Sequence, residues 1–96
     1  MNIKLAEVYN RGIGSEVNLS LRSVYINPVY VVCLREDSNM KRCLHEGGLP
    51  EGIDKRQEFT RVTINKGNHG QDITVIGTLE EIQKKLLIVN KELLRG

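Results

Sequence analysis

Four residues offer the thiol and imidazole groups used in metal binding and nucleophilic catalysis: Cys33, Cys43, His45 and His69. Their spacings match none of the short paired motifs that place two ligands on one knuckle of a zinc site. A reactive thiol should be partly exposed beside positive charge, which fits Cys43, next to Arg42, better than Cys33. No sequence context around either cysteine indicates an activated thiolate. We therefore expect no metal, no cofactor and no catalytic residue.

Glycine-rich turns and neighbouring acids are the other candidates for chemistry. The turns at 12–15 and 66–70 could present backbone amides to a phosphate, but neither runs directly into a helix, so turn formation explains both. Glu36 and Asp37 are sequence neighbours, as are Glu80 and Glu81, and neither pair resembles a separated general acid and base. The sequence thus predicts a protein that is not an enzyme.

Basic residues give the chain a formal net charge of +2, and acids are interleaved with them. Charge of this size implies solubility and indicates no particular partner. Several basic side chains nevertheless fall in or beside one segment without periodicity, where folding could bring them together. We predict a partner-binding surface from them, with a basic patch for nucleic acid as the alternative: Arg35, Lys41, Arg42, His45, Lys55, Arg56 and Arg61.

The segment 35–58 mixes charged residues with three glycines and a proline. We predict a long irregular loop here, with a short helical turn at 38–44 as an alternative. Connections beyond about 12–15 residues are uncommon in compact domains and tend to be functional or disordered. The loop is therefore either the recognition surface or a mobile insertion with no role, and we expect folding to tolerate its removal.

The last third of the chain predicts a helix that begins sharply after Thr78. Thr78 with Glu81 makes a capping box, and apolar residues follow at alternating spacings of three and four: Leu79, Ile82, Leu86, Val89 and Leu93. Three further apolar residues widen this seam and are our candidates for self-association: Leu87, Ile88 and Leu94. The alternative is that the whole wide face covers the protein's own sheet.

Strand patterns occupy most of the remaining chain. Residues 3–8 and 17–21 predict an antiparallel hairpin, and Phe59–Asn65 with a return strand at 73–76 predicts a second. The run Val29 to Leu34 is apolar at every position, which predicts a strand that is buried on both faces or central in the sheet. The expected fold is a single α+β domain spanning residues 1–96, a small antiparallel β-sheet of about five strands packed against one C-terminal α-helix.

Composition fits this small fold. The chain has 96 residues with one Phe, three Tyr and no Trp, so Val, Ile and Leu must form the core. The first ten residues lack the pattern of a signal peptide, and no apolar run approaches the roughly 18 residues of a spanning helix. We expect a cytoplasmic protein with reduced cysteines and no membrane partner.

The middle and end of the chain resemble the small flagellar and swarming motility protein family. The resemblance rests on an Asn27–Pro28 step before a Val-rich strand, Thr63–Ile64 before a glycine turn, a return strand and a final Glu-containing helix. The segment 35–58 and the N-terminal hairpin depart from the family pattern. The resemblance implies a small non-enzymatic regulatory or accessory protein and transfers no functional residues.

The expected function is that of a small non-catalytic accessory or regulatory protein that works through protein–protein contacts. We expect a homo-oligomer that also binds a protein of unknown identity. The small size and the lack of catalytic motifs fit a protein encoded by a phage or mobile element. A nucleic-acid-binding regulator with a loop-borne basic patch is the alternative.

Overall fold

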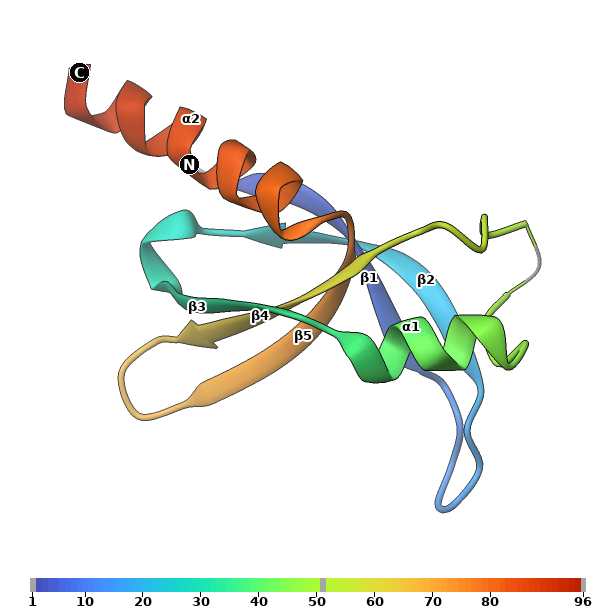
Figure 1. Cartoon of the computed structure of the whole chain (residues 1–96). Helices are drawn as coiled ribbons and strands as arrows, with labels where there is room; N and C mark the ends of the chain where they lie inside the picture. Colours follow the sequence, from blue (N-terminus) through green and yellow to red (C-terminus); the bar gives the residue numbers. More distant parts are fainter. Residues whose placement is uncertain (1, 51, 96) are drawn as a thin grey trace.

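The computed structural model describes residues 2–50 and 52–95, with side chains described as far as residue 87. Within these residues, five antiparallel strands form one sheet and two α-helices pack on it (Figure 1). The α+β class and the five-stranded antiparallel sheet are thus confirmed. The elements in chain order are β1 (Ile3–Asn10), β2 (Leu19–Ile26), the 3₁₀ helix η1 (Pro28–Tyr30), β3 (Val31–Glu36), α1 (Ser38–His45), β4 (Phe59–Asn65), β5 (Gly70–Ile76) and α2 (Leu79–Arg95).

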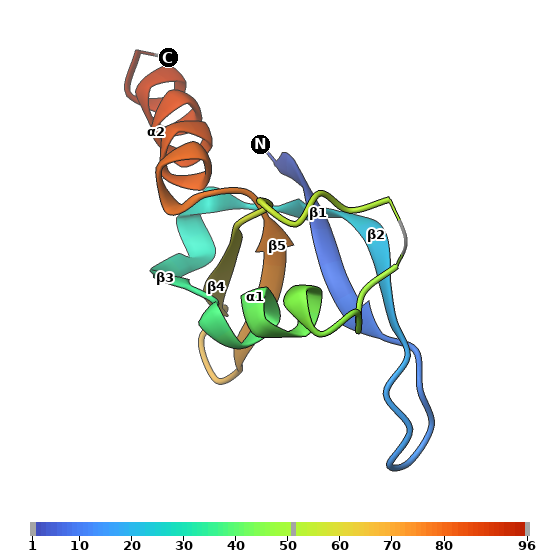
Figure 2. The same ribbon diagram turned by 45° about the vertical axis from the view of Figure 1, so that its right-hand side comes forward.

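The sheet joins a two-stranded unit to a three-stranded one, in the order β2-β1-β5-β4-β3. Strands β1 and β2 pair along their full length, from Ile3–Ile26 to Asn10–Leu19. Strand β1 pairs with β5 at Glu7–Val75 and Val8–Thr74. The end of the β1–β2 hairpin that carries the connection between Asn10 and Leu19 extends beyond the rest of the sheet, as Figures 1 and 2 show.

Apolar side chains cover both faces of the sheet because alternate strand residues point to opposite sides. One face carries the larger core cluster, which includes Ile82 of α2: Ile3, Leu5, Ile26, Val62, Ile73, Val75 and Ile82. The other face carries Val8 and Phe59, which pack with Leu44 of α1. The two helices accordingly bury opposite faces. This explains the mixed alternation of the first strand, in which Leu5 serves one core and Val8 the other.

Helix α2 begins as predicted. The backbone N–H of Glu81 donates to Thr78 Oγ1 at 3.1 Å, and the Thr78 hydroxyl donates to the Glu81 carboxylate at 3.3 Å. Ile82 is buried and Leu86 packs against the same core cluster. Beyond these first turns α2 leaves the strands and extends away from the sheet (Figures 1 and 2).

The prediction of one continuous irregular loop at 35–58 is wrong. Strand β3 continues to Glu36, and Asp37 caps α1 by accepting a hydrogen bond from the Met40 backbone N–H at 3.0 Å. The short helical turn considered as an alternative is present. Met40 and Leu44 lie four residues apart and face the same core, so a single apolar stripe is enough to hold this short helix on the sheet.

The prediction that residues 29–34 form a strand buried on both faces or central in the sheet is also wrong. Val29 belongs to η1, and β3 is an edge strand that pairs with β4 alone. The β3–β4 register shifts between Val31 and Cys33, which marks a bulge at Val32. Val31 and Leu34 pack on the core while Val32 is exposed. The apolar run therefore does not form one regular strand: it begins in the η1 turn, contains a bulge, and places only some of its side chains on the core.

Candidate functional site

The site best suited to binding is a pocket of about 240 Å³ on the sheet face that carries α2. Residues from β1, β2, η1, β4, β5 and the β4–β5 turn line it: Glu7, Arg22, Val24, Tyr25, Ile26, Asn27, Tyr30, Ile64, Lys66, Gln71 and Ile73. We call this the sheet pocket. Its aliphatic members continue the core cluster past α2, since Val24 and Ile64 pack against that cluster but remain half-buried.

A charged pair crosses the sheet pocket between β1 and β2. Glu7 and Arg22 are directly opposite in the register, and Arg22 Nε donates to Glu7 Oε1 at 2.8 Å. Glu7 is only 6% exposed. The Arg22 guanidinium carbon contacts a second group as well, since it lies 4.1 Å from the centre of the Tyr9 ring. The hydrogen bond with Glu7 raises the pKa of Arg22. A buried carboxylate needs such a partner, because an unpaired charge in an apolar setting is strongly unfavourable.

A second cation, Lys66, also lines the sheet pocket. Lys66 Nζ lies 5.6 Å from the centre of the Tyr30 ring, where the electron-rich ring face attracts an ammonium group. Glu7 and Arg22 neutralise each other, so Lys66 gives the pocket lining a surplus of one positive charge. The arrangement suits a mainly aliphatic group that carries a negative charge at its edge.

A second hollow of about 260 Å³ lies where β3 meets α1 and contains Asp37, Lys41 and Glu58. Asp37, Lys41 and Glu58 are engaged in internal contacts, whereas Glu36, which also lines the hollow, is exposed. Burial raises the pKa of Asp37, but hydrogen bonds from Thr74 and Met40 and the nearby Arg61 lower it by more, so the carboxyl titrates below its ordinary range. This hollow stabilises the fold, and the sheet pocket is the better binding site.

The seven residues predicted as a partner-binding surface do not form one patch of available charge. Three of them pair with acids: Lys41 with Glu58, Arg56 with Asp54, and Arg61 with Asp37. Lys41 Nζ also donates to the backbone carbonyls of Lys55 and Gln57, at 3.2 and 2.8 Å. The remaining predicted residues are exposed: Arg35, Arg42, His45 and Lys55.

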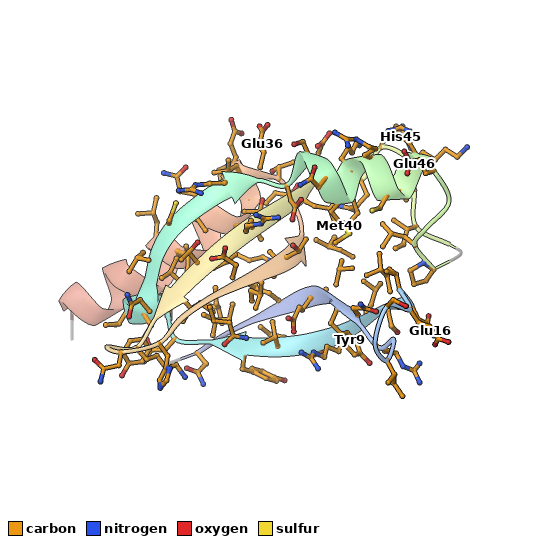
Figure 3. All side chains as sticks on the ribbon, turned by 90° about the horizontal axis from the view of Figure 1, so that it is seen from below. Tyr9, Glu16, Glu36, Met40, His45 and Glu46 are labelled. Carbon is orange, nitrogen blue, oxygen red and sulfur yellow. The ribbon has the colours of Figure 1, made fainter. Side chains whose placement is uncertain are left out.

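Arg35 lies opposite Arg61 in the β3–β4 ladder. Arg42 and His45 lie in the last turn of α1, where positive charge favours the helix terminus. Figure 3 shows His45 and Glu46 together at this end of α1. A local structural role therefore accounts for several members of the predicted surface, and its use in partner binding stays a prediction.

The candidate metal ligands are dispersed. Cys33 and Cys43 are half-buried free thiols in β3 and α1. Among the residues that the structure describes, no group of three or more His, Cys, Asp or Glu is placed to hold a metal ion. In the same part of the chain, no helix has the length and apolar character needed to cross a membrane.

The predicted self-association residues are only partly covered by the structure. Leu87 is 48% exposed on α2, as an interface residue of a free protomer would be. The side chains of Ile88 and Leu94 lie outside the described residues. The role of all three in self-association stays a prediction.

Sequence reasoning missed the members of the sheet pocket that carry charge. Glu7 had a detectable signal, because it follows Ile3 and Leu5 at the alternating positions of one strand face where a third apolar residue is expected. Arg22 and Lys66 had none, since their approach to Glu7 and Tyr30 depends on strand register and on the path of η1.

Comparison of the chain with protein-family models, curated proteins and solved structures gives no match. The resemblance to the motility proteins therefore stays a prediction. Function must be argued from the geometry of this chain.

Proposed function

We propose that this chain is a small non-catalytic accessory or regulatory protein that works through protein–protein contacts, including contacts between its own copies. The observation that carries the proposal is a concentration of exposed large apolar side chains between residues 13 and 32. They are Ile13, Val17, Leu21, Tyr25, Val29, Tyr30 and Val32. Extensive exposed apolar surface on a small domain usually marks an interaction site.

These side chains follow the hairpin tip, the edge strand β2, the η1 turn and the start of the edge strand β3. Tyr25 and Tyr30 also line the sheet pocket. Single exposed apolar residues need no explanation, but here Tyr25 and Tyr30 line the sheet pocket and the others lie at the hairpin tip, in the η1 turn or on the edge strands β2 and β3. Apolar side chains beside a pocket support protein contact as the function.

Nucleic-acid binding has weaker support. Phosphate contacts require cations that are free to replace counterions, and three of the seven predicted cations are engaged with acids. The proposed location is the cytoplasm, which fits the free thiols of Cys33 and Cys43.

Sedimentation velocity from low to high micromolar concentration tests the proposal, together with retention on a column of immobilised double-stranded DNA. We expect concentration-dependent association and no salt-dependent retention. A strictly monomeric chain that is held by DNA and released by salt would overturn the proposal in favour of the nucleic-acid alternative. Lys55→Glu, which reverses an exposed charge, is the control for general charge effects.

A further inference from the structure

The β1–β2 hairpin presents its tip away from the body of the protein (Figures 1 and 2). Hydrogen bonds hold the connection in shape. Asn10 Oδ1 accepts from the backbone N–H groups of Gly12 and Asn18 at 2.8 and 2.9 Å, and the Arg11 N–H donates to the Asn18 carbonyl at 2.8 Å. Because these bonds fix the base of the loop, the tip is a presented surface that loses little conformational freedom on binding.

The hairpin tip, residues 12–17, combines two apolar side chains with one acid. Ile13 is 86% exposed and Val17 is 73% exposed. Glu16 is the one charged residue within the tip, and Figure 3 shows it at the outer end of the hairpin. Two aliphatic side chains held in water at the end of a projecting loop cost free energy that burial in a partner would recover.

The sheet pocket has the complementary properties. Its aliphatic lining includes Val24, Ile64 and Ile73, and Lys66 supplies the surplus positive charge. An apolar cavity of about 150 Å³ already holds a molecule the size of benzene, so a pocket of about 240 Å³ can accept an aliphatic side chain. A negative group entering beside that side chain would meet Lys66.

We infer that the sheet pocket binds the hairpin tip of a second copy of this chain, with Ile13 or Val17 on the aliphatic lining and Glu16 paired with Lys66. This inference rests on the self-association in the proposed function. In both views of the chain the tip and η1, which borders the pocket, lie at opposite ends. Tip and pocket are different surfaces, so two copies that exchange tips reciprocally would form a closed dimer, and copies that each engage a different neighbour would form rings or filaments.

The first test removes each side of the contact separately. Ile13→Ser with Val17→Ser should raise the dissociation constant about tenfold or more in sedimentation velocity, because the side chain that enters the pocket loses its apolar burial. Lys66→Glu should also weaken association, and adding Glu16→Lys to it should restore association by exchanging the charges. Urea unfolding midpoints near that of the unmodified chain would show that each variant folds.

The second test mixes two variants. The serine variant keeps an intact pocket and Lys66→Glu keeps an intact tip, so together they should form a two-chain complex and nothing larger. A mixture that stays monomeric, or a serine variant that associates like the unmodified chain, would overturn the inference.

Leu87→Glu separates this inference from the proposed function. If it alone abolishes association, copies meet through α2, and the proposed function stands while the hairpin contact fails. If the unmodified chain is monomeric at high micromolar concentration, both fail.

Discussion

Replacing Asp37 with Ala should destabilise the protein more than removal of any exposed acid, because this carboxylate joins three elements. It accepts a hydrogen bond from the Met40 N–H of α1 at 3.0 Å and one from the Thr74 hydroxyl of β5 at 2.6 Å. It also lies 3.5 Å from a guanidinium nitrogen of Arg61 on β4. Asp37 itself is 5% exposed.

The size of the effect follows from these contacts. Loss of a helix N-cap costs about 0.5–2 kcal/mol, and a hydrogen bond to a charged group contributes about 1.5–3 kcal/mol. The contacts are coupled, so we expect a total loss of about 2–4 kcal/mol in the free energy of unfolding. For a domain of this size, each 1 kcal/mol corresponds to roughly 4–8 °C in Tm.

Urea unfolding followed by circular dichroism measures the loss, with Asp54→Ala as the matched control. Asp54 is also an acid paired with an arginine, and the hydrogen bonds from Arg56 lower its pKa. It lies exposed in the loop before β4, so its removal should leave the midpoint nearly unchanged. Equal midpoints for the two variants would show that Asp37 does not join the elements as argued.

The stability contribution of Asp37 should also depend on pH. The pKa of Asp37 is lower in the folded protein than its ordinary value, so the unfolded chain binds the proton more tightly. Its contribution is therefore fully present above the unfolded pKa of about 3.9 and is lost as the pH falls through the folded pKa. The stability difference between the unmodified chain and Asp37→Ala should shrink on acidification below about pH 4. A difference that stays constant down to pH 2 would contradict this assignment.

Three further outcomes can be checked by urea unfolding. Ile82→Ala should cost about 2–5 kcal/mol because Ile82 is fully buried. Ile64→Ala should cost less because Ile64 is half-buried beside the sheet pocket. A larger loss for Ile64→Ala would mean that Ile82 of α2 does not pack into the core as described. Replacing residues 37–54 with a short Gly and Ser linker should destabilise the fold, since it removes the buried Leu44, and an unchanged midpoint would restore the dispensable-loop prediction. Gly77→Ala should destabilise the protein because its φ of 135° disfavours a side chain and the new Cβ would lie 3.0 Å from Ile82 Cδ1; a neutral result would show that the β5–α2 turn relaxes freely.

The sequence predicted those elements whose local signals agree with their tertiary surroundings. Strand β4 spans Phe59–Asn65 as expected, and Thr78 caps α2. The alternation of the two strands predicts that Val62, Ile64, Ile73 and Val75 are buried; Val62, Ile73 and Val75 are, but Ile64 is only half-buried. In each case the turn or cap residues and the apolar period point to the same structure.

The errors arose where tertiary contacts decide between local alternatives. Helix α1 is eight residues long, and so short a helix is unstable in isolation. It persists because Leu44 is buried against the sheet and Asp37 reaches β4 and β5. The exposed position of Val32 depends on a bulge in an edge strand, and no spacing in the sequence specifies which strand lies at an edge.

The candidate site was harder to predict than the fold. Basic residues in a segment without periodicity suggested a free surface, but Lys41 and Arg61 are engaged by Glu58 and Asp37. The sheet pocket combines residues from six parts of the chain. Its location follows from the strand order, which brings β1 beside β5 and cannot be read from either strand alone.

The buried Glu7 also determines how β1 and β2 can align during folding. In the native register its carboxylate faces Arg22; a slip of two residues would place Ser20 or Val24 opposite it while keeping every side chain on its proper face. Hydrophobic patterning alone does not exclude such a slip, since only a one-residue shift reverses the faces. The slipped hairpin would bury a carboxylate without its guanidinium partner, at a cost of several kcal/mol. The pairing of Glu7 with Arg22 thus disfavours two-residue register slips of the hairpin that apolar packing alone would allow.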